Sequence, residues 1–154
     1  MPELVFVYGT LKEGFPNHGR NNGRRLGGHY RTRLPFPLYV VRLANEDRAP
    51  WLVCKPGAGS RVIGQVFEVD SAGLVRMDAF EEVGLATGYV RGRIELEAVD
   101  GMKPPVHAHV YMKQQHQLAD CLAREGPYEE YTHALAVGYR LALESAPSTP
   151  CDLS

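Results

Sequence analysis

The spacing of apolar and polar residues along the chain predicts a domain rich in β-strands. Residues 4–8 form an uninterrupted apolar run, which is typical of a strand buried on both faces. Residues 12–25 are polar and glycine-rich, which indicates a long loop. Strand-like segments follow at residues 28–33, 38–43 and 62–69.

A short helix is expected next. Asp70 or Ser71 can cap it, because a short oxygen-bearing side chain accepts hydrogen bonds from the free N–H groups of a first turn. Leu74, Met77 and Phe80 recur at intervals of three and give the helix one apolar side. Two glutamates follow Phe80 directly, so they are expected at the end of this helix.

Two alternating segments then predict a hairpin with an elongated loop. Residues 89–99 place apolar side chains on one face and charged ones on the other, as a half-buried strand does. Residues 106–112 alternate similarly, with His107 and His109 on the second face. Residues 100–105 between them contain Asp-Gly and Pro-Pro, which are turn formers.

The last third of the chain is expected to be helical. Residues 113–124 form one helix that Gly126-Pro127 ends, and residues 128–145 form a longer one. Strands first, a helix in the middle, a hairpin and then helices describe an α+β fold with a mixed, curled sheet. We assign residues 1–146 to one domain and residues 147–154 to a loose tail.

Composition and charge narrow the class of protein. The chain has 154 residues and a formal net charge of −1, which argues against a general nucleic-acid binder. No apolar run approaches the roughly 18–20 residues that cross a bilayer, so no membrane association is expected. Cys54, Cys121 and Cys151 are odd in number and far apart, and no signal peptide is expected, so a reducing cytoplasm is the expected compartment.

The first candidate site is the end of the first strand, at Tyr8, Gly9, Thr10 and Leu11. A buried strand that stops at a glycine can turn its backbone N–H groups outward into a nest for a carboxylate or a developing oxyanion. Taken alone, the same residues favour a tight turn after an edge strand over such a nest.

The second candidate is the acidic end of the predicted helix, at residues 77–82 (MDAFEE). A carboxyl group there can be partly buried, which raises its pKa toward neutrality and suits it to accept and return a proton. The alternative is an ordinary helix end with solvated acids.

Other patterns are weaker. His107 and His109 have a spacing that a metal can use, but no third ligand is suggestively placed, so we expect no metal. Arg91 and Arg93 alternate with glutamates, which favours a solvated face with cross-strand pairs. Cys54 is expected to be a small core residue rather than a nucleophile.

In combination these segments resemble a known family. The relevant segments, in chain order, are residues 4–12 (LVFVYGTLK), 50–52 (PWL), 56–59 (PGAG), 64–67 (GQVF), 77–81 (MDAFE) and 88–91 (GYVR). Their order and spacing resemble the γ-glutamylcyclotransferase (AIG2-like) family, and most closely its γ-glutamylamine cyclotransferase branch. The resemblance covers roughly residues 3–115.

The resemblance implies a curled, barrel-like sheet with a few flanking helices, and an enzyme that needs no cofactor. It implies that Glu81 is the general acid/base, rather than Glu82. It also implies that Tyr8, Gly9, Thr10 and Leu11 cradle the glutamyl group of a small-molecule γ-glutamyl substrate, with Tyr89 lining the cavity.

The last third departs from the amine-specific branch. There, residues 126–131 (GPYEEY) are more similar to a helix of the branch that acts on γ-glutamyl amino acids, which implies that Tyr131 is a second cavity tyrosine. The leading hypothesis is release of an amine, such as that of γ-glutamyl-ε-lysine, with formation of 5-oxoproline.

Several alternatives remain open. The same chemistry could act on γ-glutamyl amino acids or on a γ-glutamyl-protected biosynthetic intermediate. The cavity could instead belong to a non-catalytic module that binds a small acidic metabolite. An adaptor that uses the arginine-rich residues 20–33 is disfavoured by the acidic balance of the rest of the chain.

Overall fold

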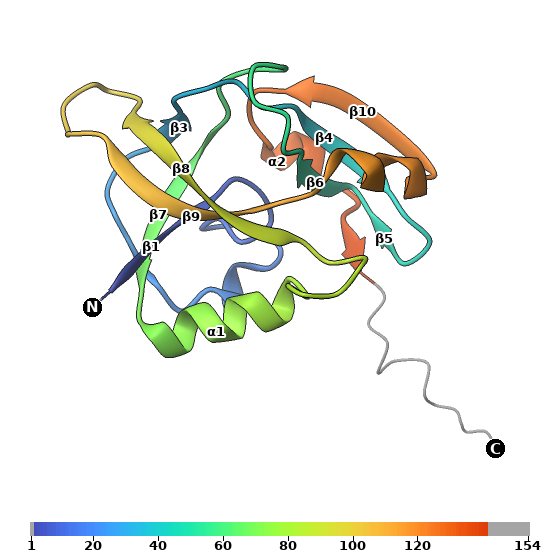
Figure 1. Ribbon diagram of the computed structural model, residues 1–154, viewed down its shortest axis with the longest axis horizontal. Helices are drawn as coiled ribbons and strands as arrows, with labels where there is room; N and C mark the ends of the chain where they lie inside the picture. The colour runs from blue at the N-terminus through green and yellow to red at the C-terminus, as the bar shows by residue number, and fades with distance from the viewer. Residues whose placement is uncertain (1, 142–154) are drawn as a thin grey trace.

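The structure is a computed structural model that describes residues 2–141 (Figure 1). Its strands are β1 Glu3–Val7, β2 Arg24–Arg25, β3 Tyr30–Thr32, β4 Leu38–Arg42, β5 Glu46–Asp47, β6 Ala49–Leu52, β7 Ile63–Val69, β8 Val90–Ala98, β9 Val106–Met112, β10 Ala123–Tyr128 and β11 Arg140–Leu141. Its α-helices are α1 Ser71–Phe80 and α2 His133–Ala136, and short 3₁₀ helices cover His18–Arg20 and Gln115–Asp120. The expected α+β class is confirmed.

The main sheet closes on itself. Its strands follow the order β1-β9-β8-β3-β7, and β7 pairs back with β1, which makes a small barrel. β1 runs parallel to β9, whereas the other pairs in this ring are antiparallel. The sheet is therefore mixed and curled, as predicted. The hairpin of β8 and β9 is the longest pairing in it, and it carries the expected long connection.

The apolar run of β1 is buried on both faces because it separates two cores. Phe6 belongs to the core inside the barrel, together with residues from β3, β7, β8 and β9. Val5 and Val7 point the other way and pack against Leu74 and Met77 of α1. Both sets of side chains are almost fully buried, so each face of the strand contributes apolar area removed from water.

Helix α1 lies along one side of the barrel (Figure 1). Asp70 caps it, since the Asp70 carboxylate accepts a hydrogen bond of 2.7 Å from the Gly73 N–H. Leu74 and Met77 face the barrel, as their spacing predicted. The helix ends at Phe80, and Glu81 is its C-terminal cap residue. The acidic pair is thereby placed at the end of a helix that is fixed against the core.

A second, smaller sheet packs beside the barrel, with strand order β10-β4-β6. Every residue of β6 is buried, including Trp51. A short pairing of β5 with β11 extends the structure beyond this sheet. Of these elements, β5, β6 and β11 line the cavity that the ends of α1 and β1 also reach.

The prediction of helices in the last third was wrong. Only Gln115–Asp120 of the first expected helix is helical, in a 3₁₀ turn that Gln114 and Gln117 close with reciprocal hydrogen bonds. Residues 123–128 instead pair with the open edge of β4, so Gly126-Pro127 lie inside a strand at a shift in its register. Backbone bonds to a neighbouring strand thus override the local helical pattern there.

The longer expected helix, residues 128–145, is also wrong where the structure describes it. Thr132 caps the single-turn helix α2, which ends before Gly138. Gly138 has a φ of 86°, a conformation that interrupts a right-handed helix. Residues 142–145 and the predicted tail, 147–154, lie outside the described residues, and so does the domain boundary at residue 146. Within residues 2–141, none of the helices is both long and apolar enough for a bilayer.

Candidate active site

A cavity of about 530 Å³ lies where the ends of β1, α1 and the segment before β8 meet. Its volume is that of a typical small-molecule site. Six of the seven residues that the sequence singled out line it: Tyr8, Gly9, Thr10, Leu11, Glu81 and Tyr89. These residues come from three separate parts of the chain, so the fold brings them together.

Glu81 enters the cavity from the end of α1. Its backbone N–H donates to the Met77 carbonyl at 2.9 Å, which continues the helix by one more bond. Its carbonyl accepts a hydrogen bond of 2.9 Å from the Tyr89 N–H, which ties the segment before β8 to the end of the helix. Glu81 and Tyr89 are therefore held on the same side of the cavity.

The Glu81 carboxyl is the most strongly perturbed acid along the described residues. Burial raises its pKa to about 8, because a charged carboxylate loses hydration inside the protein. The negative charges of Glu46 and Glu82 act in the same direction, while the Lys113 ammonium opposes them. The neighbouring Glu82 is exposed. A carboxyl group with this pKa can both accept and donate a proton near neutral pH.

The glycine loop, which we define as residues 8–11, forms another part of the cavity wall. Gly9 packs against the ring of Pro50 so closely that a side-chain carbon at this position would overlap the ring. The Thr10 carbonyl accepts a hydrogen bond of 2.8 Å from the Asn17 N–H, which holds the loop in place. Within residues 2–141, no acceptor is found for the backbone N–H groups of Gly9, Thr10 and Leu11. These donors suit an anionic oxygen of a ligand.

Tyr8 and Tyr89 form part of the cavity wall, and their hydroxyl groups are uncharged. The Tyr8 hydroxyl donates to the Tyr111 carbonyl at 2.7 Å, and the Tyr89 hydroxyl donates to the Pro50 carbonyl at 3.2 Å. Burial raises the pKa of both phenols, and the nearby Glu81 carboxylate raises them further. Both side chains therefore stay neutral at physiological pH.

Tyr131, the seventh predicted residue, is not among the residues that line the cavity. It is fully buried in the core, where its ring packs 6.0 Å from that of Phe15. Its hydroxyl donates to the Arg48 carbonyl at 2.6 Å, and its own carbonyl accepts from the Lys12 ammonium at 2.6 Å. The tyrosine that does reach the cavity from this part of the chain is Tyr139.

Lys113 is a buried cation that the sequence did not single out. It is 4% exposed, and its ammonium donates to the Thr87 carbonyl at 2.6 Å. The same nitrogen lies 4.6 Å from the ring centre of Trp51 and 4.3 Å from that of Tyr89. Burial lowers its pKa, while the Glu46 and Glu81 carboxylates raise it. Its only sequence signal was its place directly after an alternating strand.

Asn17, Glu46 and Tyr139 are further cavity residues that sequence reasoning missed. They come from the polar loop after β1, from β5 and from the residue before β11, none of which shows an apolar period. Their polar character was visible in the sequence, but their meeting depends on long-range pairing that no local pattern encodes.

The two histidines on β9 have different surroundings. His109 Nε2 lies 2.8 Å from a carboxylate oxygen of Glu3, and His107 is exposed. Along residues 2–141, no three His, Cys, Asp or Glu side chains are grouped in a way that could hold a metal ion. Arg91 forms an ion pair of 2.8 Å with Asp78, and Arg93 faces His109 across the hairpin.

Comparison with known proteins identifies the family. Residues 5–132 match the family model described as gamma-glutamyl cyclotransferase, AIG2-like. The chain belongs to this family. The matched region includes all seven residues named from the sequence.

Several relatives carry a more specific name. A bovine gamma-glutamylaminecyclotransferase is 39% identical over 112 residues, which are 70% of this chain and 63% of the bovine protein. The human protein of the same name is 43% identical over 83 residues, 51% of this chain and 52% of its own. The matched regions thus span about half to under two-thirds of these two relatives.

Solved structures agree with the fold. A crystal structure of an AIG2-like protein from Mus musculus has a TM-score of 0.67 at 30% identity, and covers 85% of this chain and 88% of its own. A structure named gamma-glutamyl cyclotransferase has a TM-score of 0.55 at 19% identity, with 74% of this chain and 68% of its own covered, which supports the fold alone.

Proposed function

We propose that this protein is a γ-glutamylamine cyclotransferase-type enzyme, which converts a γ-glutamyl amine into 5-oxoproline and the free amine. The observation that carries this proposal is the position of Glu81, whose carboxyl has a pKa of about 8 and shares a cavity with the glycine loop. The names of the bovine and human relatives support the choice of an amine as leaving group.

The reaction is an intramolecular acyl transfer. The substrate's α-nitrogen bonds to its own γ-carbonyl carbon, and the bond from that carbon to the leaving nitrogen breaks. The α-ammonium gives up two protons overall and the leaving amine takes up two, so the reaction balances without a cofactor or an external nucleophile. The protein has to fold the flexible glutamyl chain into a reactive shape, which can contribute a large part of the rate enhancement.

Glu81 is the group proposed to move the protons. In its ionised form it accepts a proton from the α-ammonium, and it then returns a proton to the leaving nitrogen. A pKa of about 8 makes the Glu81 carboxylate a stronger base than an ordinary glutamate, so taking a proton from the α-ammonium is less uphill than it would be for a solvated carboxylate. The N–H groups of the glycine loop, for which no backbone acceptor is found within residues 2–141, are the groups we propose to receive an anionic oxygen of the substrate.

The experiment that tests this proposal measures 5-oxoproline release. The panel contains γ-glutamyl-ε-lysine, simple γ-glutamylamines and γ-glutamyl amino acids, and wild type is compared with Glu81→Gln. We expect activity in wild type and loss of at least about 100-fold in Glu81→Gln, as is usual for a general acid/base. Glu82→Gln, which makes the same change at the adjacent exposed position, should lose far less.

Each result has a definite meaning. Normal turnover by folded Glu81→Gln would exclude the proposed role of this carboxyl. Preference for amino acid leaving groups would assign the enzyme to the other branch of the chemistry. Silence across the panel, together with tight binding of 5-oxoproline or glutamate, would favour a binding role.

Within residues 2–141, Cys54 and Cys121 form no disulfide, which is compatible with our further proposal that the protein acts in the cytoplasm.

A further inference from the structure

The cavity contains a second shielded carboxyl group, that of Glu46, which the proposed mechanism does not use. Glu46 begins β5 and lines the cavity together with Glu81. Its carboxylate accepts a hydrogen bond of 2.9 Å from the hydroxyl of Tyr139. Burial raises the pKa of Glu46, while this hydrogen bond lowers it. The bond therefore favours the negatively charged form inside the cavity.

The same tyrosine connects Glu46 to the glycine loop through Asn17. The Asn17 side-chain amide donates to the Tyr139 hydroxyl at 2.9 Å and to the Thr10 hydroxyl at 2.9 Å. The donors and acceptors agree in direction, because the Tyr139 oxygen accepts from the amide and its proton goes to Glu46. Three consecutive hydrogen bonds thus separate the Glu46 carboxylate from Thr10.

At its Glu46 end, this network lines the same cavity as Glu81. The charged groups that act on the two carboxyls are Lys113, beyond the end of β9, and Glu82, beside Glu81, and the side chains of Arg20 and Asp120 also line the cavity. The phenols of Tyr8, Tyr89 and Tyr111 also face Glu81, and all three stay neutral. Glu46 is therefore the negative charge from another strand that acts on Glu81, and like charges in a shielded cavity disfavour double ionisation.

We propose that Asn17, Tyr139 and Glu46 form a positioning network for the reaction, in which Asn17 fixes the glycine loop and Glu46 holds a negative charge beside the catalytic carboxyl. This inference rests on the proposed function. It assigns two tasks that can be separated. The Asn17 end orders the substrate-binding loop, and the Glu46 end keeps Glu81 ready to hold a proton near neutral pH.

The pH dependence of kcat/KM tests the Glu46 end. In wild type we expect an acidic limb near pH 8, because the ionised form of Glu81 starts the reaction. Glu46→Gln removes the charge but keeps an acceptor for Tyr139, so the limb should move to lower pH by about one unit. Glu125→Gln is the matched control, since Glu125 also accepts a tyrosine hydrogen bond but lies outside the cavity. Its limb should stay with that of wild type.

Steady-state kinetics test the Asn17 end. Tyr139→Phe removes the hydroxyl that joins Asn17 to Glu46, and we expect KM to rise roughly 3- to 10-fold, the value of one lost hydrogen bond. Tyr128→Phe is the control, because the Tyr128 hydroxyl donates to Glu125 at 3.1 Å on the outer surface. A KM equal to that of Tyr128→Phe would contradict the loop-ordering task.

An NMR titration without substrate tests this inference independently of the proposed function. Carboxyl carbons of ¹³C-labelled glutamate are titrated by NMR in wild type and Glu46→Gln, and Glu81→Gln assigns the resonance. A downward shift of the Glu81 midpoint in Glu46→Gln supports the coupling even if the substrate panel is silent, a result that would reject only the proposed function. If the Glu81 midpoint and the acidic limb of kcat/KM in Glu46→Gln both stay within about 0.3 pH unit of wild type, the proposed effect of the Glu46 charge on Glu81 is excluded.

Discussion

The burial of Glu81 lowers the free energy of unfolding of the protein in a pH-dependent way. A carboxyl group whose pKa is raised in the folded protein is bound to its proton more tightly there than in the unfolded chain. Below the ordinary value of 4.5 both states are protonated, and the group has no differential effect. As pH rises toward 8 the unfolded chain releases the proton first, so this group destabilises the fold progressively.

Glu81→Gln should therefore stabilise the protein, and the gain should depend on pH. Within residues 2–141 no side-chain hydrogen bond contributes to the pKa of Glu81, so the amide loses no partner of this kind. We expect a gain in unfolding free energy of about 1 kcal/mol near pH 8, discounted because the carboxyl keeps some solvent contact, and none at pH 4. Thermal unfolding of both proteins across this range measures it. A gain that is the same at both ends would show that the cause is not ionisation.

The close packing of Gly9 leads to a second prediction at the scale of one residue. A methyl group at Gly9 would overlap the Pro50 ring, so Gly9→Ala should displace the glycine loop, cost about 1–3 kcal/mol of stability and lower kcat/KM. Gly19→Ala is the control, because a methyl group there meets no atom within 4 Å. Denaturant unfolding and 5-oxoproline release compare the two. Similar behaviour of both variants would contradict the steric argument.

Single residues also show the limit of sequence reasoning about this site. Glu81 and the glycine loop end regular elements, so their places in the fold were predictable from apolar spacing. Tyr131 and Tyr139 lie in the same short stretch, and only the buried position of Tyr131 and the pairing of β11 decide which of them reaches the cavity. That choice depends on contacts with residues 46–48, far away in the sequence.

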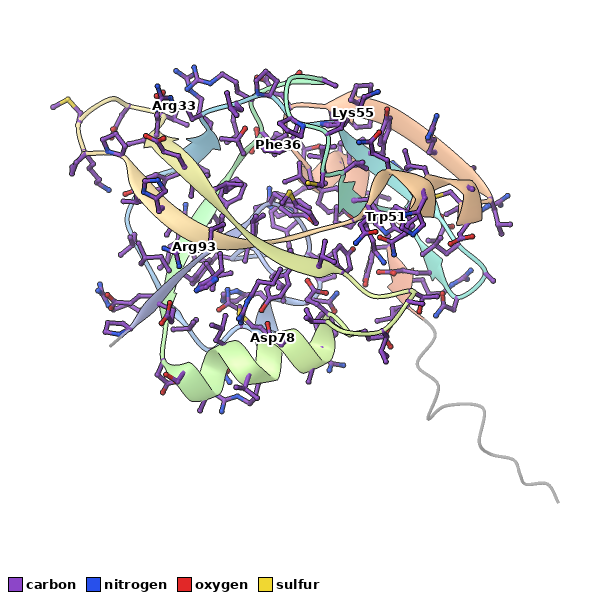
Figure 2. All side chains as sticks on the ribbon, viewed as in Figure 1. Arg33, Phe36, Trp51, Lys55, Asp78 and Arg93 are labelled. Carbon is purple, nitrogen blue, oxygen red and sulfur yellow. The ribbon has the colours of Figure 1, made fainter. Side chains whose placement is uncertain are left out.

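At the scale of elements, α1 is fixed at its two ends by different means. At the start, Asp70 caps the first turn. Near the end, Asp78 accepts hydrogen bonds from the Tyr111 hydroxyl at 2.7 Å and from Arg91 at 2.8 Å, which join the helix to β9 and β8. Figure 2 shows Asp78 on the side of α1 that faces the hairpin. The end that carries Glu81 is thus held by tertiary contacts.

This difference predicts two distinct variants. Asp78→Ala should lower kcat by about 10-fold or more, since a small displacement of a catalytic group is costly, and it should also reduce stability. Asp70→Ala should cost about 1 kcal/mol of stability, as capping variants do, with kcat nearly unchanged. Thermal unfolding and kinetics of the two variants separate the effects. Equal losses of kcat would mean that the helix moves as one body.

The elements that the sequence predicted correctly were those with a clear apolar pattern of their own. β1 is a continuous apolar run, the hairpin of β8 and β9 alternates, and α1 repeats its apolar residues; these elements and β3, β4 and β7 were found near their expected bounds. The strand β10 was mistaken for the end of a helix because its exposed residues carry no strand-like alternation. It forms because β4 offers a free edge, and a partner's edge is not visible in a local pattern.

At the scale of the whole molecule, three of the five arginines in the arginine-rich residues 20–33 form ion pairs. Arg24 pairs with Glu68, Arg25 with Glu13 and Arg33 with Glu95, at 2.7–2.9 Å. Such exposed pairs add little stability, but they remove the field that a polyanion would need. Positive charges of this segment are thus balanced by neighbouring carboxylates, as the charges of the whole chain nearly balance in total.

Binding to a polyanion should accordingly be weak. On immobilised heparin at neutral pH we expect elution below about 0.15 M NaCl, because few unpaired cations are available to release counterions. A chromatographic salt gradient measures this directly. Retention beyond roughly 0.5 M NaCl would contradict the prediction and would revive a nucleic-acid role for this segment.

The burial of Trp51 has a practical consequence. It is the one tryptophan of the chain (labelled in Figure 2), it is 2% exposed, and it lines the cavity. The Lys113 ammonium lies 4.6 Å from its ring centre. Its indole emission therefore reports on a single place in the molecule, and any ligand that moves Lys113 alters the electric field on that ring. The protein carries its own optical probe of occupancy, so titrations of uncleaved substrates with Glu81→Gln need no added label.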